Sequence, residues 1–193
     1  MSLPTSSAVF RNPILSAEIG DPFVFRAPDG RYHCLGTTAP DGFLSWSSDD
    51  LVTWEPSGYA FRNPPGSWAT EDFWAPEVVE SGGRFHLFFS ARWHRNRSLR
   101  IGTAVSDHPQ GPYRLDSDRP LFDFGYAAID AHVHLGEDGR NWLYFVRDCS
   151  ENIVDGVHES HLYGVEVAGD LRTLLGDPVL LLRPEQEWEF RSG

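Results

Sequence analysis

Two aspartates, Asp21 and Asp130, stand at matching places in the sequence, each at the start of a segment that reads as strand, tight turn and strand. Carboxylates that face one pocket can hydrolyse a glycosidic bond, because one deprotonates water while others set pKa values and hold the sugar. Asp21 precedes Pro22, so the alternative for this residue is a structural role as the cap of a turn. Whether the two side chains act together depends on the fold.

The segments that begin with Asp21 and Asp130 belong to a repeat with three copies. The first half of each copy contains two strands and a glycine turn, and these halves are residues 21–37, 75–90 and 130–147. The turn glycines lie 53 and 56 residues apart: Gly30, Gly83 and Gly139. The second halves supply a third strand, a polar turn and the start of an outer strand, at 44–54, 101–113 and 162–174. Four strands at this period indicate a β-propeller blade.

The sequence predicts an all-β fold that is part of a β-propeller. Aromatic residues occur in short alternating runs separated by 18 Gly and 14 Pro, and no segment has sustained helical spacing. One domain over 1–193 divides into blades near 12–70, 71–128 and 129–182, with a fourth starting after 183. A closed propeller needs about four to eight blades, so we expect a partial ring. A β-sandwich with accidental self-similarity is the alternative.

The innermost strand of each propeller blade starts near the central axis. Asp21, Ala75 and Asp130 are the residues that start the three repeats. We therefore expect them to converge on one pocket although they are far apart in the chain.

Charge and hydropathy disfavour several classes of partner. The chain has 28 Asp and Glu against 16 Lys and Arg, a net charge of −12, which repels nucleic acid and anionic membranes. No stretch approaches the ~18 apolar residues of a membrane span, and the N-terminus lacks a signal-peptide layout. We expect a cytoplasmic protein, with secretion of a native precursor as the alternative. Cys34 and Cys149 each lie near the end of an apolar run and are predicted to be buried, inert thiols.

Seven motifs follow one another at blade-like spacing over most of the chain. They are NPIL (12–15), DPFVF (21–25), DGRY (29–32), SWSSDDLVTWE (45–55), FWAPEV (73–78), GTAVSDHPQGPY (102–113), and ID (129–130) followed by EDGRNWLYF (137–145). Taken together, the motifs closely resemble glycoside hydrolase family 43. The resemblance implies a five-bladed β-propeller and an inverting glycosidase that cleaves terminal arabinofuranosyl or xylosyl linkages in plant polysaccharides or oligosaccharides. Arabinofuranosidases, β-xylosidases and arabinanases share the same carboxylates, so the substrate stays open.

The resemblance implies a role for three residues. Asp21 matches the general base, which deprotonates the attacking water. Asp130 matches the carboxylate that orients the general acid and raises its pKa, and a nearby negative charge has that effect. Trp74 matches the aromatic residue that lines the sugar pocket, where a flat indole suits the apolar face of a sugar ring. A place in the core is the alternative for Trp74.

The general acid of the family is a glutamate in a Glu-Gly-Pro-like motif that starts the fourth blade, and no such motif occurs here. Glu187 and Glu189 are the only stand-ins, and neither is followed by a small residue and proline. We therefore expect the acid to lie beyond Gly193 and this chain by itself to be catalytically silent. We also expect the open flanks of the first and third blades to pair in a homodimer or to aggregate.

Several other residues are candidates for the pocket or its rim. His132, two residues after Asp130, is expected to line the pocket, and His134 to pack between blades. Two histidines on one strand face also suggest a zinc site, but no third ligand is evident, and no metal ligands are predicted. Phe73 and Trp68 are expected at the pocket rim, and the polar loop 92–97 at the solvated surface.

The resemblance requires no cofactor and allows a structural calcium ion on the propeller axis. The main rival to the enzyme is a non-catalytic, carbohydrate-binding propeller remnant, which would hold the same saccharides by stacking and hydrogen bonds. A propeller family that acts on fructosides fits less well, because its usual Asn-Asp-Pro-Asn start is replaced by Gly20-Asp21-Pro22-Phe23.

Overall fold

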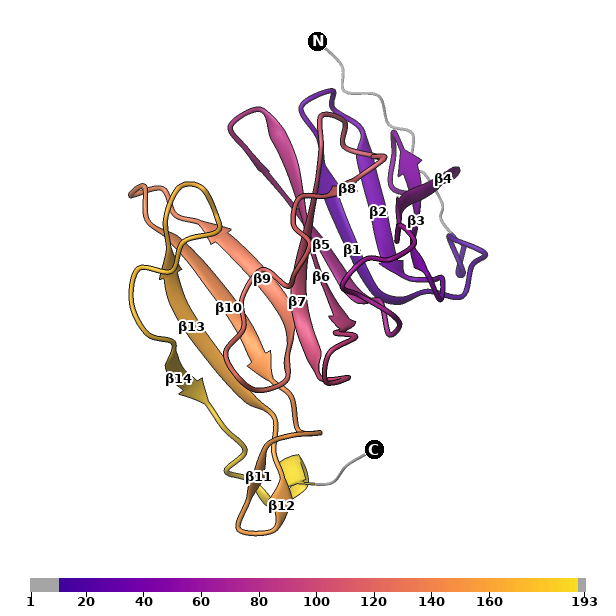
Figure 1. Cartoon of the computed structure of the whole chain (residues 1–193). Helices are drawn as coiled ribbons and strands as arrows, with labels where there is room; N and C mark the ends of the chain where they lie inside the picture. Colours follow the sequence, from indigo (N-terminus) through magenta and orange to yellow (C-terminus); the bar gives the residue numbers. More distant parts are fainter. Residues whose placement is uncertain (1–10, 191–193) are drawn as a thin grey trace.

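A computed structural model describes residues 11–190 of the protein. Within this range the chain forms fourteen β-strands and one short 3-10 helix, η1 (Glu187–Phe190), and it contains no α-helix. None of the described segments is a helix long and apolar enough to cross a bilayer. The strands form three four-stranded antiparallel sheets and one small hairpin (Figure 1).

The first sheet follows the order of the chain, so each strand pairs with the next. Its strands are β1 (Gly20–Arg26), β2 (Tyr32–Thr37), β3 (Gly42–Ser48) and β4 (Glu55–Arg62).

The second sheet repeats the same order. Its strands are β5 (Trp74–Ser81), β6 (Arg84–Arg92), β7 (Leu99–Ser106) and β8 (Arg114–Leu115).

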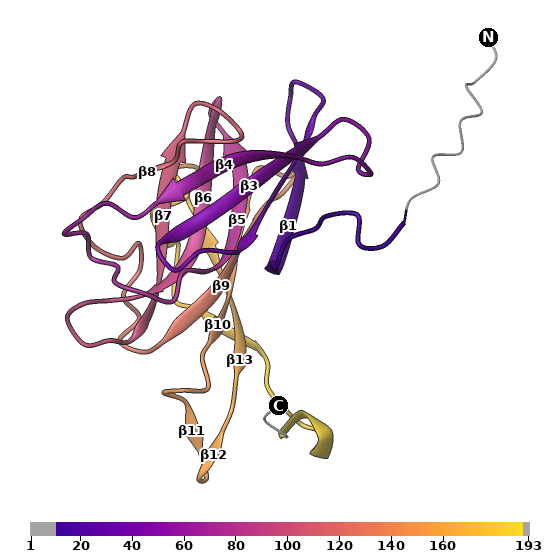
Figure 2. The ribbon, with the colours of Figure 1, turned by 90° about the vertical axis from the view of Figure 1, so that its right-hand side faces the viewer.

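The third sheet has the same order with a hairpin inserted between its second and third strands. The sheet contains β9 (Ala128–Leu135), β10 (Asn141–Arg147), β13 (His161–Val167) and β14 (Val179–Leu182). The hairpin contains β11 (Ile153–Val154) and β12 (Val157–His158), and it projects beyond the sheets (Figures 1 and 2).

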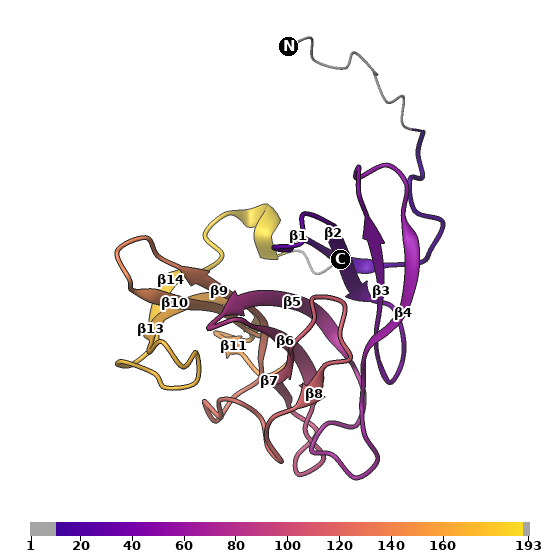
Figure 3. The same cartoon turned by 90° about the horizontal axis from the view of Figure 1, so that it is seen from above.

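The three sheets surround a common axis with their first strands innermost. β5 packs against β1 on one side and β9 on the other, although each is hydrogen-bonded only within its own sheet. The outer strands are β4, β8 and β14, each at the end of its sheet, and Figure 3 shows β4 at the edge of the molecule. Four-stranded meanders around an axis are the architecture of a β-propeller. The predicted all-β, partial-propeller fold is confirmed.

The first hairpin of each sheet closes through a glycine with a left-handed backbone. The φ angles are 88° at Gly30, 74° at Gly83 and 82° at Gly139. The N–H of Gly30 donates to the carbonyl of Ala27 at 2.9 Å, and that of Gly139 to the carbonyl of Gly136 at 3.0 Å. Glycine adopts this conformation without a steric cost, which is why the turn repeats at these positions.

An aromatic core joins the first sheet to the second. The strands of these two sheets cross one another in the view of Figure 2. Phe89 on β6 is fully buried, and its ring centroid lies 5.1 Å from that of Phe61, 5.7 Å from that of Phe43 and 6.0 Å from that of Trp68. A Cβ at Gly102 on β7 would lie 2.4 Å from Trp68 and 2.6 Å from Phe89. Glycine is therefore required beneath this cluster.

A second core joins the second sheet to the third. Phe88 and Ile101 of the second sheet pack with Val133 and Phe145 of the third. The ring of Phe145 also stacks on Phe124, with the centroids 4.4 Å apart. These two cores hold the sheets at fixed positions around the axis.

The two cysteines differ in environment. Cys34 on β2 is buried, and burial raises the pKa of its thiol to about 11. Cys149 is only half-buried, because it lies in the connection that leads to the β11–β12 hairpin. The prediction of a buried thiol is right for Cys34 and wrong for Cys149.

The outer strand of the third sheet is apolar and exposed. All four of its side chains reach solvent: Val179, Leu180, Leu181 and Leu182. A contiguous apolar row of this kind is suited to contact with another protein surface. The homodimer expected from the sequence stays a prediction.

Replacing Phe89 with alanine tests the core between the first two sheets. Phe89→Ala leaves a cavity among Phe43, Phe61 and Trp68, and we expect it to lower the free energy of unfolding by about 3–5 kcal/mol. Val24→Ala on β1 is the control, because the Val24 side chain is exposed and its loss should cost less than about 0.5 kcal/mol. Urea denaturation measures both. Equal effects would show that Phe89 does not organise the core.

Candidate active site

The residues that start the three inner strands meet at one small pocket on the axis. Its volume is about 260 Å³, and seven residues line it: Asp21, Pro22, Phe23, Ala75, Pro76, Glu77 and Asp130. Asp21 comes from β1, Ala75 from β5 and Asp130 from β9. The structure therefore brings together the two carboxylates that the sequence singles out.

Each of the three starting residues has a left-handed backbone. The φ angles are 46° at Asp21, 44° at Ala75 and 55° at Asp130, an uncommon conformation for residues other than glycine. At each of them the pairing with the second strand of the sheet shifts register, which is the mark of a β-bulge. A bulge redirects the side chain that it carries, so it turns these residues toward the axis.

Hydroxyl groups connect two of the three bulges, at Ala75 and Asp130, to the sheet before them. The N–H of Ala75 donates to Oγ1 of Thr37 at 3.0 Å, and the N–H of Asp130 donates to Oγ of Ser90 at 3.0 Å. Thr37 ends β2, and Ser90 lies near the end of β6, so both belong to the second strand of the preceding sheet. Thr37 also donates its own proton to Oδ2 of Asp21 at 2.7 Å.

A third carboxylate, Glu77, lies in the axial pocket two residues beyond the β5 bulge. Oε2 of Glu77 is 2.7 Å from Nδ1 of His132 on β9, so this hydrogen bond joins the second sheet to the third. His132 is exposed and lies beside the pocket lining rather than in it. The predicted role of His132 in substrate binding stays a prediction.

Asp130 lies in a negative environment. Its side chain reaches solvent at the mouth of the pocket, yet the surrounding protein desolvates it enough to raise its pKa to about 6. Desolvation is the largest cause, and the charges of Asp21, Asp148 and Glu77 add to it. Both effects favour the neutral carboxyl over the carboxylate.

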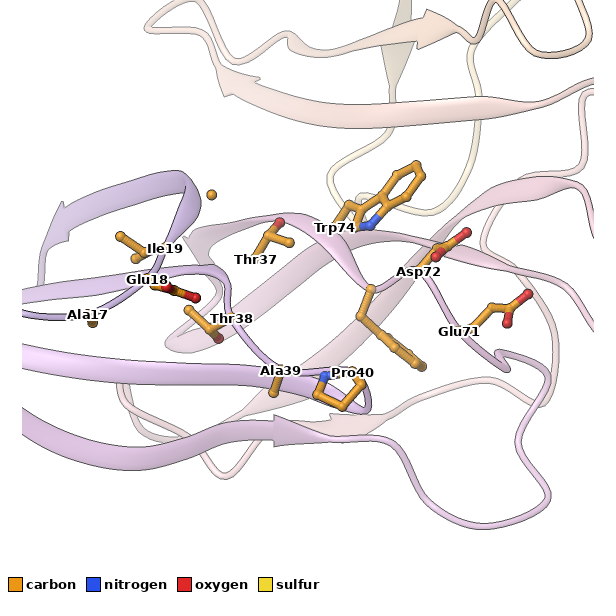
Figure 4. A pocket seen from close by; sticks show the side chains of 12 residues that line it. Ala17, Glu18, Ile19, Thr37, Thr38, Ala39, Pro40, Glu71, Asp72 and Trp74 are labelled. Carbon is orange, nitrogen blue, oxygen red and sulfur yellow. The ribbon is translucent and has the colours of Figure 1, made fainter.

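Trp74 is half-buried and lies next to the axial pocket, immediately before Ala75. It lines a larger, open pocket of about 840 Å³ together with Thr37 and Asp72. Figure 4 shows Trp74 near Thr37, with Glu71 and Asp72 on one side of the pocket and Glu18 and Ile19 on the other. Thr37 thus stands between the two pockets, because it borders the larger one and contacts Asp21 in the smaller.

Phe73 and Trp68 are both buried in the core between the first two sheets. Phe73 is 2% exposed and packs near Phe43, Phe61 and Phe89. Trp68 is 1% exposed, and its ring stacks on Phe89. The burial of Trp68 corrects its expected place at the rim. Phe73, although buried, is among the residues that line the larger pocket, and its predicted role in substrate binding stays a prediction.

The structure also describes His134, the possible metal ligands and the loop 92–97. His134 was expected to pack between blades, but it is exposed, since its side chain alternates with the buried Val133 on β9. No group of three His, Cys, Asp or Glu that could hold a metal occurs in the described part of the chain. In the loop 92–97, Arg92 pairs with Asp72 and Arg97 pairs with Glu71, so this loop is linked to the wall of the larger pocket.

Glu189 does not line the axial pocket. The carboxylate of Glu189 accepts the N–H groups of Glu185 and Gln186 at 2.8 and 2.7 Å, which closes η1 locally. The side chain of Glu187 lies outside the described part of the structure.

Comparison with known proteins identifies the family. A sequence model for "Glycosyl hydrolases family 43" matches residues 10–193. The chain belongs to glycosyl hydrolase family 43. The resemblance carried by the seven motifs is therefore confirmed.

Solved structures and curated relatives agree with this assignment. A thermostable family-43 glycoside hydrolase is 42% identical, with a TM-score of 0.87, over 94% of this chain and 58% of that one. An endo-arabinase from Bacteroides thetaiotaomicron is 30% identical, with a TM-score of 0.79, over 91% of this chain and 60% of that one. The β-D-galactofuranosidase xynD of Aspergillus niger is 29% identical over 96% of this family 43 chain and 55% of its own length. The chain thus spans little more than half the length of these relatives.

Three residues at the site were missed in the sequence: Thr37, Glu77 and Ser90. Glu77 occupies the position of Phe23 in the first repeat and His132 in the third, two residues after the bulge, so alignment of the repeats gives a signal for it. Thr37 and Ser90 also occupy matching positions, opposite Gly20 and Trp74 in the strand pairing. The hydroxyl groups of these two residues form hydrogen bonds between neighbouring sheets, and the sequence of a single strand does not indicate them.

The raised pKa of Asp130 makes stability depend on pH. Because folding raises this pKa above its value in the unfolded chain, the folded state binds the proton more tightly, and stability is lost as pH rises from about 4 to about 6. Asp130→Asn removes this loss. We expect its Tm to exceed that of the wild type by about 2–4 °C at pH 7.5, and by less at pH 4, in thermal denaturation.

Asp155→Asn is the matched control for this experiment. It places an amide at another left-handed position, in the exposed turn between β11 and β12 and outside the axial pocket, and so measures the effect of asparagine on the backbone. A gain in Tm for Asp130→Asn that is equal at pH 4 and pH 7.5 would show that the charge of Asp130 is not the cause.

Proposed function

We propose that this family 43 chain forms the part of an inverting glycoside hydrolase that carries the general base, Asp21, and the pKa-modulating carboxylate, Asp130. Its substrates would be terminal arabinofuranosyl or xylosyl linkages of plant polysaccharides or oligosaccharides. One observation carries the proposal: two carboxylates more than a hundred residues apart are turned into the same axial pocket by the same kind of bulge.

The pocket supports a direct displacement by water. Asp21, as a carboxylate, accepts a proton from water while the water oxygen attacks the anomeric carbon from the face opposite the leaving group. The glycosidic C–O bond breaks, and a general acid protonates the departing oxygen. The proposal places this acid outside residues 11–190. The negative charge of Asp130 raises the pKa of the general acid, so the acid keeps its proton until it transfers it to the departing oxygen.

The larger pocket beside the axis supports the binding of a saccharide. Half-buried Trp74 offers an indole face to the apolar side of a sugar ring, and Glu18, Glu71 and Asp72 offer hydrogen-bond acceptors to hydroxyl groups. The names of the relatives include an endo-arabinase, a galactofuranosidase and a β-xylosidase, which supports arabinosyl, galactofuranosyl and xylosyl compounds as candidate substrates. Aryl arabinofuranosides, xylosides and galactofuranosides therefore form the first panel of substrates.

Asp21→Ala tests the general base. Alanine already occupies the matching bulge at Ala75, so the substitution suits the backbone. In the full-length protein we expect hydrolysis of aryl glycosides to fall by about 10²–10⁴-fold, because no carboxylate accepts the proton of water. Added azide, a nucleophile that needs no base, should restore release of the aryl group and give a glycosyl azide of inverted configuration, detected by NMR.

Asp118→Ala is the control for this variant, because Asp118 is exposed and lies outside both pockets. It should leave the rate unchanged. An Asp21→Ala protein with full activity would show that Asp21 is only a structural cap. Saccharide binding without hydrolysis by the wild type, even of aryl glycosides with good leaving groups, would support a carbohydrate-binding protein instead.

Asp130→Asn tests the modulating carboxylate. The variant removes a negative neighbour of the general acid, so the acid loses its proton at lower pH. We expect the alkaline limb of the kcat/KM profile to move to lower pH while Asp21 keeps its role. An unshifted alkaline limb in a folded variant would contradict the modulating role.

A further inference from the structure

The hydroxyl of Thr37 makes two hydrogen bonds in opposite directions. Oγ1 accepts the N–H of Ala75 at 3.0 Å, and it donates to Oδ2 of Asp21 at 2.7 Å. A threonine hydroxyl has one proton, and a backbone N–H can only donate. The bond from Ala75 therefore occupies a lone pair and leaves the proton of Thr37 for Asp21.

The chain of contacts crosses from one sheet to the next. Asp21 begins in β1, Thr37 ends β2, and Ala75 lies in β5 of the second sheet. The two hydrogen bonds of Thr37 thus hold the Asp21 carboxylate in place relative to the backbone of the neighbouring sheet as well as to its own strand. A hydrogen bond from a hydroxyl to an ionised carboxylate is charge-assisted and stronger than one between neutral groups.

The contact with a carboxylate is particular to Thr37 among the three repeats. Ser90 holds the matching position in the second sheet and accepts the N–H of Asp130, but within residues 11–190 it donates to no carboxylate. Val146 pairs with Ile129 at the matching position of the third sheet and has no hydroxyl. Only the first repeat combines the link between sheets with a bond to an acidic side chain.

We propose that Thr37 is a positioning residue for the general base Asp21. It holds Oδ2 and so aims Oδ1, which has no hydrogen-bond partner within residues 11–190, at the attacking water. The inference rests on the proposed function of Asp21 as the base. Misplacement of a catalytic group by about 1 Å can cost about 10²-fold in rate.

Thr37→Val removes the hydroxyl and keeps the size and branching of the side chain. We expect kcat for an aryl glycoside to fall by about 10–100-fold, because the Asp21 carboxylate is no longer held in position to accept the proton of water. KM should change by less than about threefold. Thr37→Ser keeps the donor and should recover most of kcat. Thr37→Cys, with a weak S–H donor, should fall between the two.

Thr103→Val is the matched control. Oγ1 of Thr103 donates to Oδ1 of Asp116 at 2.6 Å, the same type of bond, on β7 and outside the axial pocket. It should lower stability without lowering kcat in the folded fraction. If Thr37→Val and Thr103→Val had the same kcat, Thr37 would be merely structural and the proposal would be overturned.

Two further results separate this proposal from that for Asp21. Loss of activity in Asp21→Ala together with full kcat in Thr37→Val would overturn the positioning role and leave the base assigned. If Asp21→Ala kept full activity, the assignment of the base would fail first. Crystal structures of the wild type and Thr37→Val test the geometry apart from activity, and an Asp21 carboxylate unmoved in the variant would also overturn the proposal.

Discussion

A left-handed residue at the start of each inner strand is the constraint on which the site depends. Side chains alternate between the two faces of a regular strand, so a strand without a bulge would present different residues to the axis. The bulges at Asp21, Ala75 and Asp130 break the alternation at the same place in each sheet. Hydroxyl groups of Thr37 and Ser90 hold two of these bulges from the neighbouring sheet. The same bulge therefore carries the unusual backbone conformation, the contact between sheets and the direction of the side chain.

The cores between the sheets determine whether these bulges can meet. The inner strands share no ladder of hydrogen bonds, so their distance from one another depends on packing farther out. Phe89 and Trp68 pack over Gly102 between the first and second sheets, where no larger residue fits. Phe88 and Phe145 belong to the core between the second and third sheets. Because protein interiors are close-packed, this arrangement allows little sliding of one sheet past another.

The sequence predicts the repeat well and the faces of individual strands poorly. Glycine turns and alternating apolar residues are local signals, and they are sufficient to predict three four-stranded sheets and the convergence of Asp21 and Asp130. Phe73 and Trp74 are adjacent aromatic residues just before a bulge, and only the structure shows that both border the larger pocket, the first buried in the core and the second half-buried. Glu77 was missed because the bulge at Ala75 shifts the alternation of side chains between the two faces of β5.

Asp21 and Asp130 share a backbone conformation but not a chemical environment. Asp21 is held by the hydroxyl of Thr37, whereas Asp130 is partly desolvated and faces the charges of Asp21, Asp148 and Glu77. With its pKa raised to about 6, Asp130 carries a full charge only above that pH. A carboxylate can raise the pKa of a neighbouring acid only while it is itself charged, so the modulation fades as Asp130 takes up its proton. For the modulating role proposed for Asp130, its desolvation and its negative neighbours therefore set the lower pH limit.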